Sequence, residues 1–145
     1  MSKLPSASRG VSSLLAGEHS DCTVRALANI GCMNYAEAHE LLKSYGRRNG
    51  DGLSMDKVHE AYTEAGLECI GTFGDTTLAR WFFSTVCSVR RNKGCTLKTF
   101  VQTHQEGSYV VYIEGHVLAL VDGDIVDLMD NAANARVLAA WKIPD

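Results

Sequence analysis

The sequence predicts an α+β domain in which helices come first and an antiparallel sheet of about four to five strands follows. Three observations support this fold class. Apolar residues recur at the spacing of amphipathic helices up to residue 86. After Gly107 the pattern changes to runs of β-branched and aromatic residues. Two of these runs flank the dipeptide Asp122-Gly123, and an Asp-Gly pair in that setting is a strong hairpin signal.

Capping residues place the predicted helices along the chain. The first helix is predicted to begin at Cys22, because Ser20 and Asp21 directly before it are favoured N-cap residues. Gly31 fits the end of this helix, and the pattern at 34–37 is a capping box that opens the next one. Further helices are predicted over residues 35–45, 55–65, 76 or 77 to 86, and 97–104. Ser54 is the predicted cap of the helix at 55–65, and Thr96 that of the helix at 97–104.

The strands are predicted from β-branched and aromatic runs. They cover residues 67–71, 108–114, 116–122, 124–129 and 137–143. The stretch RRNKGC at 90–95 is predicted to be a basic loop. The hairpin loop is either Asp122-Gly123 or Gly123-Asp124, and the sequence leaves this choice open.

Length and composition indicate a single globular domain over residues 1–145, with 1–20 loosely ordered. Hydrophobic residues make up 46% and charged residues 21%, which is enough apolar material to build a core. No apolar run approaches the roughly 18 residues that span a membrane. The N-terminal stretch is also too weakly apolar for a signal peptide, so we expect a cytoplasmic protein without a membrane partner.

The chain has five cysteines, at positions 22, 32, 69, 87 and 95. The number is odd and no CxxC pair is present, so neither a disulfide framework nor a zinc site is expected, and no cofactor is implied. Cys22 differs from the rest because it is predicted at a helix N-terminus. The helix dipole there lowers the pKa of a thiol, and the free N–H groups of the first turn can bind an oxyanion. We interpret the other four as core or surface thiols.

A nucleophilic thiol needs a base, and His116 is our candidate among the histidines. It opens a strongly apolar predicted strand. The alternative is that it is an ordinary polar residue at the end of that strand, without a catalytic role. His39 and His59 lie within predicted helices and are expected at the surface. His104 ends a predicted helix, where a cation is favourable.

An aspartate on the neighbouring strand can orient the histidine. A two-residue hairpin loop puts Asp127 on the same face as His116, as its diagonal neighbour when the loop is Asp122-Gly123. A register slip of one residue selects Asp130 instead. The alternative is an edge-strand aspartate that points to solvent.

Three segments resemble the papain-like cysteine peptidase superfamily, most closely the small papain-like proteins encoded by bacteriophages. They are DCTVRALANI at 21–30, GSYVVYIEGHVLALVDGDIVDLMD at 107–130 and VLAAWKI at 137–143. In that superfamily the cysteine heads a helix, and the histidine and aspartate lie on adjacent strands of a following sheet. The resemblance implies a papain-like fold, with Cys22 as nucleophile, His116 as base and Asp127 as orienter. Residues 46–95 match no part of the pattern.

The resemblance also implies a function and shows one departure. The expected reaction is acyl transfer on an amide bond of a protein or peptide, as in a peptidase, an isopeptidase or a glutamine deamidase. The superfamily commonly has a glutamine upstream of the cysteine as an oxyanion donor, and Ala16 stands there in this chain. His19 and Ser20 are the candidates to replace it. The alternative is a catalytically weak scaffold that binds a host factor, in the host cytoplasm if the chain is phage-encoded.

A nucleic-acid partner is a third hypothesis. Basic residues gather between positions 80 and 98, and the aromatic residues 81–83 lie among them. A solvated basic loop beside a core helix explains the same residues, or the loop could recognise an acidic partner. Since no nucleic-acid motif accompanies the charge and the net charge is −3, we do not expect a nucleic-acid partner.

Overall fold

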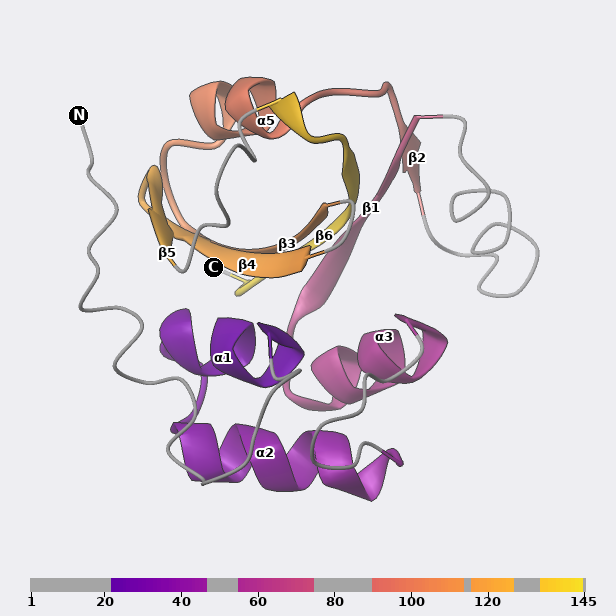
Figure 1. The fold of residues 1–145 in the computed structure, drawn as a ribbon, viewed down its shortest axis with the longest axis vertical. Helices are drawn as coiled ribbons and strands as arrows, with labels where there is room; N and C mark the ends of the chain where they lie inside the picture. The colour runs from indigo at the N-terminus through magenta and orange to yellow at the C-terminus, as the bar shows by residue number, and fades with distance from the viewer. Residues whose placement is uncertain (1–21, 47–54, 75–89, 114–115, 127–133, 145) are drawn as a thin grey trace.

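The computed structural model describes residues 22–46, 55–74, 90–113, 116–126 and 134–144. They form an α+β fold in which a mixed sheet separates three helices from a fourth (Figure 1). The helices are α1 (Cys22–Asn29), α2 (Tyr35–Ser44), α3 (Met55–Glu64) and α5 (Leu97–Thr103). The strands are β1 (Glu68–Phe73), β2 (Arg91–Asn92), β3 (Ser108–Ile113), β4 (His116–Val121), β5 (Asp124–Val126) and β6 (Val137–Lys142).

The capping predictions are confirmed for α2 and α5. The Asn34 side chain accepts a hydrogen bond from the Glu37 N–H at 2.8 Å, and Glu37 Oε1 accepts one from the Asn34 N–H at 3.0 Å. Thr96 caps α5 by accepting from the Thr99 N–H at 3.3 Å. These side chains satisfy N–H groups that a helix start leaves without partners. The predicted cap Ser54 and the helix predicted from 76 or 77 lie outside the described residues.

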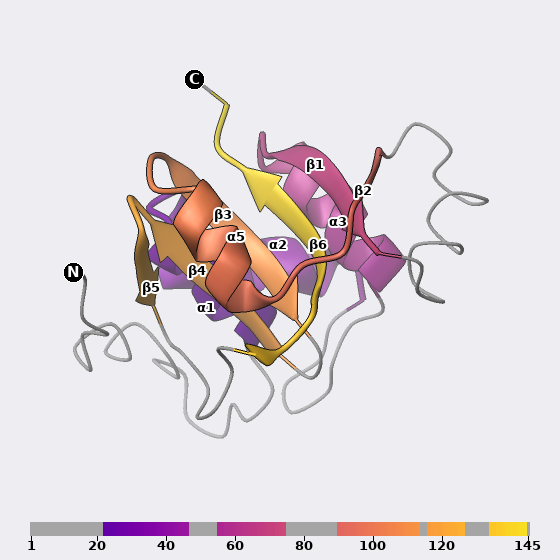
Figure 2. The ribbon, with the colours of Figure 1, turned by 90° about the horizontal axis from the view of Figure 1, so that it is seen from above.

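The sheet has six strands in the order β2-β1-β6-β3-β4-β5 (Figure 2). The predicted strands over 67–71, 108–114, 116–122 and 137–143 are confirmed, with ends that differ by one or two residues. In the β4–β5 hairpin Val121 pairs with Asp124, which leaves Asp122-Gly123 as the loop. Both loop residues have positive φ, 48° and 86°, as this kind of tight hairpin turn requires.

The expectation of a purely antiparallel sheet is wrong at one edge. Residues 91–92, inside the predicted basic loop, form β2 and pair parallel with β1. A strand of two residues is too short for alternation to be visible in the sequence, so the sequence pattern did not predict β2. The approach is close, because a Cβ at Gly71 would lie 2.3 Å from the Arg90 carbonyl oxygen. Gly71 has φ +122°, so a glycine is needed there for both reasons.

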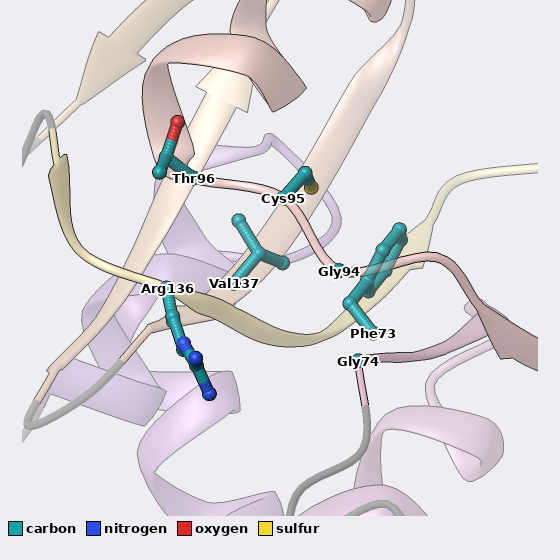
Figure 3. Close-up of a pocket in the computed structure, with 7 residues that line it drawn as sticks. All are labelled: Phe73, Gly74, Gly94, Cys95, Thr96, Arg136 and Val137. Atoms are coloured by element: carbon teal, nitrogen blue, oxygen red, sulfur yellow. The ribbon is translucent and has the colours of Figure 1, made fainter.

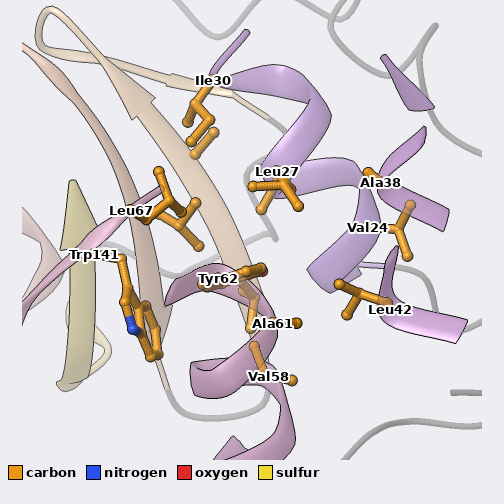
Figure 4. Close-up of a cluster of buried hydrophobic side chains, with 14 of the residues drawn as sticks. Val24, Leu27, Ile30, Ala38, Leu42, Val58, Ala61, Tyr62, Leu67 and Trp141 are labelled. Atoms are coloured by element: carbon orange, nitrogen blue, oxygen red, sulfur yellow. The ribbon is translucent and has the colours of Figure 1, made fainter. Parts of the chain in front are cut away.

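Two hydrophobic clusters fill the two faces of the sheet. We call the one between the sheet and α1–α3 the first core cluster (Figure 4), and the one between the sheet and α5 the second core cluster. Neighbouring strand residues alternate between them: Val117 belongs to the first and Leu118 to the second. Trp141 is fully buried in the first cluster and lies edge-on to Tyr62, with ring centroids 5.2 Å apart. The packing fixes α1 against one face of β4.

The expectation that His39 and His59 lie at the surface is wrong. His39 is only 7% exposed, since it lies one helical turn after Tyr35 on the inward side of α2. His59 is half-buried, and its Nδ1 accepts a hydrogen bond from Trp141 Nε1 at 3.1 Å. Burial lowers the pKa of His59, against a smaller opposite effect of Glu60. Both histidines therefore contribute to packing.

In the described part of the chain, no helix has both the length and the apolar character that a bilayer crossing requires.

Candidate active site

Cys22 is the first residue of α1 and is half-buried. The helix packs against β4, so its start lies beside the start of that strand. The next two residues, Thr23 and Val24, are buried and hold the first turn in place. The backbone N–H groups of a first helical turn have no partner within the helix, so they are available to a charge at this point.

His116 is the first residue of β4, and the structure brings it to Cys22. The side chains of these two residues are hydrogen-bonded, and the Val117 backbone N–H also donates to the Cys22 sulfur. The two residues are far apart in sequence and meet because α1 lies on the face of the sheet that includes Val117. The arrangement is that of a thiol next to a base.

The environment lowers the pKa of the Cys22 thiol. Burial alone raises this pKa, because a thiolate loses hydration. The hydrogen bonds from His116 and from the Val117 N–H, with the charges of His116 and Arg25, outweigh burial and leave the pKa below its ordinary value. Such a shift favours the thiolate, which is the reactive form.

The other described thiols show the opposite behaviour. Burial raises the pKa of Cys32 and of Cys95, and raises that of Cys69 to about 11. All four described cysteines are free thiols. Among the cysteines that the structure describes, Cys22 therefore stands apart as the one whose thiolate is stabilised.

Two tyrosines near Cys22 were not among the predicted site residues. Burial raises the pKa of Tyr62 and of Tyr112, and the negative charge of a Cys22 thiolate adds to both shifts. Tyr62 is fully buried, and its hydroxyl donates to the Thr23 carbonyl oxygen at 2.8 Å. It therefore links α3 to the first turn of α1.

Tyr112 is half-buried on β3, directly opposite Val117 of β4. Both side chains are on the first-cluster side of the sheet, where α1 begins. Within the described residues the Tyr112 hydroxyl has no hydrogen-bond partner. The alternation in 108–114 already put Tyr112 on the same face as Val110, but only the position of α1 puts Cys22 beside that face.

The remaining predicted site residues lie outside the described part of the chain. These are the orienter candidates Asp127 and Asp130 and the oxyanion candidates His19 and Ser20. Their roles stay predictions.

The His116 side chain lies on the opposite face of the sheet from the one that was expected in choosing Asp127. Strand alternation was expected to keep His116 on the face of Ile125, which packs against the second core cluster. The His116 side chain instead bonds to Cys22, which packs against the first cluster. The first residue of a strand can turn its side chain around the sheet end, so alternation does not choose the orienter.

Over the ranges that the structure describes, no group of three or more His, Cys, Asp or Glu side chains is arranged to hold a metal ion.

Comparisons with protein-family models, with curated proteins and with solved structures found no match.

Proposed function

We propose that this protein is a cysteine hydrolase of the papain-like type that transfers the acyl group of an amide bond in a protein or peptide. The observation that carries the proposal is the hydrogen-bonded pair of Cys22 and His116 at the start of α1, with a lowered thiol pKa. A thiolate beside an imidazole is the arrangement that acyl transfer requires. The resemblance of the segments around both residues supports the same assignment.

The first half of the reaction forms an acyl-enzyme. His116 holds the proton of Cys22, and the thiolate attacks the carbonyl carbon of the substrate. The new S–C bond moves an electron pair onto the carbonyl oxygen, and the N–H groups of the first turn of α1 stabilise that oxyanion. His116 then protonates the leaving amine as the C–N bond breaks.

The second half releases the acyl group. His116 takes a proton from water, and the resulting hydroxide attacks the thioester carbon. The C–S bond breaks, the carboxylic acid leaves, and Cys22 is again a thiolate beside a protonated His116. An acceptor amine in place of water gives transamidation by the same steps, and a glutamine side chain as substrate gives deamidation.

On the resemblance of the segment that contains it, we assign Asp127 as the residue that orients His116, with Asp130 as its alternative. A carboxylate in this position fixes the tautomer of the imidazole and stabilises the imidazolium. The scheme also requires a reduced thiol, so we place the reaction in a cytoplasm, that of the host if the chain is phage-encoded. The free thiols at positions 22, 32, 69 and 95 support a reducing compartment.

The decisive experiment measures the alkylation rate of each cysteine against pH, by iodoacetamide labelling and peptide mass spectrometry. In wild type, Cys22 should react fast near pH 6, where an ordinary thiol with a pKa of about 8.5 is almost entirely protonated. His116→Ala removes a hydrogen bond and a charge that lower the Cys22 pKa, so the midpoint should move to higher pH.

The control variant is His104→Ala, which removes a histidine stacked on Phe100 on the other side of the sheet. It should leave the Cys22 profile unchanged, and Cys69 serves as an internal reference in every sample. If Cys22 titrates like Cys69, or if both histidine variants give the wild-type profile, the proposed function is wrong.

A further inference from the structure

A cavity of about 490 Å³ opens where β1 ends and β6 begins (Figure 3). Two segments bound it, Phe73–Gly74 on one side and 94–96 on the other, and the start of β6 completes the wall. The volume is in the range of sites that hold a small molecule or a bulky side chain. It contains neither Cys22 nor His116, so it is a separate site.

The described part of the cavity wall is partly apolar and contains one cation. Phe73 and Val137 provide apolar surface, while Cys95 and Thr96 add a thiol and a hydroxyl. Arg136 contributes a guanidinium group. Gly74 and Gly94 line the wall without side chains; a Cβ at Gly94 would lie 3.4 Å from the Gly74 Cα, so their backbones are close.

Arg136 has no counter-ion among the described residues of this wall. Its side chain is exposed, and within the described residues it has no hydrogen bond or ion pair. The lining residues that the structure describes include no carboxylate. An arginine presents a planar fork of donors that fits a carboxylate with two parallel hydrogen bonds. A single cation in a partly apolar wall suits one carboxylate better than a phosphate dianion.

The cavity lies at the same end of the sheet as the Cys22–His116 pair. Ile113, the last residue of β3, pairs with His116 on one side and with Val137 on the other. The strands run side by side (Figure 2), so about 10 Å separates the backbones at these two positions. The cavity lies on the second-cluster side of the sheet and Cys22 on the first-cluster side, so a peptide that joins them must pass around the sheet end. An extended peptide advances roughly 3.3–3.6 Å per residue, so at least about three residues are needed for this path.

We propose that this cavity is a carboxylate-binding subsite, in which Arg136 binds an acidic side chain or the C-terminal carboxylate of the peptide substrate of Cys22. The identity of the ligand as a substrate rests on the proposed function. The preference for a carboxylate is a property of the cavity alone, and Cys95 in its wall reports on it without any reaction at Cys22.

The first test compares two alkylating reagents at Cys95 in the full chain. Iodoacetate carries a carboxylate and iodoacetamide does not, so the ratio of their rates measures the preference of the cavity for a negative charge. Arg136→Gln should lower this ratio at Cys95 about five-fold, the effect of one nearby charge in water. The ratio at Cys69 should not change.

Two further variants separate local recognition from net charge. Lys43→Gln makes the same change in net charge on the exposed side of α2 and should leave the Cys95 ratio at its wild-type value. Arg136→Lys keeps the charge and should keep most of the ratio. An unchanged ratio in Arg136→Gln, or an equal loss in Lys43→Gln, overturns the subsite.

The second test uses peptides as competitors. Three hexapeptides differ only in their carboxylates: one has a glutamate and an amidated end, one a glutamine and an amidated end, and one a glutamine and a free end. Protection of Cys95 from iodoacetamide by the first identifies an acidic side chain as the ligand, and protection by the third identifies a terminal carboxylate. Protection should disappear in Arg136→Gln.

The outcomes that contradict the proposal are distinct from failure of the proposed function. Equal protection by the neutral peptide, or full protection by inorganic phosphate at the same concentration, overturns the carboxylate assignment. Protection of Cys95 without slower alkylation of Cys22 overturns the link to the substrate. An ordinary pH profile of Cys22 contradicts the proposed function, while the Cys95 results still decide whether the cavity binds a carboxylate.

Discussion

Cys22 and Cys69 are both half-buried thiols that pack against the first core cluster, and their surroundings give them opposite chemistry. At Cys69 burial raises the pKa to about 11, and a hydrogen bond from the Gly71 backbone acts more weakly in the other direction. At Cys22 burial acts in the same sense, but His116, the Val117 N–H and Arg25 reverse the result. Burial alone therefore does not decide whether a thiol is reactive.

The difference follows from where each cysteine lies in the secondary structure. Cys69 is inside β1 and pairs with Trp141 of β6, so the backbone around it is engaged in the sheet. Cys22 begins a helix and faces the start of a strand, and both are places where backbone N–H groups remain available. The end of an element thus provides donors that its middle does not.

The largest expected effect is the loss of the nucleophile. Cys22→Ala should lower kcat/KM for amide hydrolysis by at least about 10⁴-fold, since no other group can form the thioester. Cys69→Ala is the matched variant and should keep the rate within about two-fold, because its thiol is protonated in the folded protein. The measurement is the initial rate on a peptide substrate found by screening, with far-ultraviolet circular dichroism to show that both variants fold.

The opposite result sharpens the choice between enzyme and binding scaffold. If Cys22→Ala retains both the hydrolysis rate and the effect of the protein on the host, the catalytic assignment fails. The alternative of a scaffold that binds a host factor then takes its place.

The next effect concerns the orienter of His116. Asp127→Asn should lower kcat by about 10²–10⁴-fold, because an amide stabilises the wrong tautomer of the imidazole. Asp130→Asn is the comparison, and it should have little effect if Asp127 is the orienter. The two variants are compared by kcat against pH. A loss confined to Asp130→Asn assigns the role to Asp130 instead.

A smaller effect separates the two tyrosines near Cys22. We expect the Tyr112 hydroxyl, which has no hydrogen-bond partner among the described residues, to donate to the oxyanion, so Tyr112→Phe should lower kcat about 10–10²-fold and leave the unfolding free energy nearly unchanged. Tyr62→Phe removes a buried hydrogen bond to the Thr23 carbonyl, so it should lower the free energy of unfolding by about 1–2 kcal/mol.

Steady-state kinetics and urea unfolding of both tyrosine variants make this comparison. The assignment of Tyr112 is contradicted if Tyr112→Phe destabilises the fold as much as Tyr62→Phe does while kcat stays at the wild-type value.

Local signals in the sequence predicted most of this architecture, and long-range contacts account for what it missed. The capping box at 34–37 and the hairpin at Asp122-Gly123 depend on a few neighbouring residues, so the sequence displays them. The parallel pairing of β2 depends on the close approach of a distant segment to Gly71, which no local pattern encodes.

The candidate site divides in the same way. Cys22 at a helix start and His116 at a strand start are features of local sequence, and both positions are as predicted. The Val117 N–H that lowers the thiol pKa lies on β4, and the tyrosines beside the thiol lie on α3 and β3, so these neighbours become visible only when α1 is placed on the sheet. The direction of the His116 side chain likewise depends on α1, which is why strand alternation gave the wrong face.

The smallest expected effect belongs to Arg25, whose charge is the weakest of the influences that lower the Cys22 pKa. Arg25→Gln removes one positive charge from the surroundings of the thiolate, so the pKa of Cys22 should rise. At a pH below that pKa the thiolate fraction then falls, and alkylation there should slow by about two- to five-fold, as expected for a charge interaction screened by water. Above the pKa the rates of the two proteins should converge, because the thiol is ionised in both.

Lys43→Gln matches the change in net charge at a distant exposed position on α2 and should leave the profile unchanged. A uniform slowing of Cys22 at every pH would instead mean that Arg25 acts on access to the sulfur, and the electrostatic contrast with Cys69 would then rest on His116 and the Val117 N–H alone.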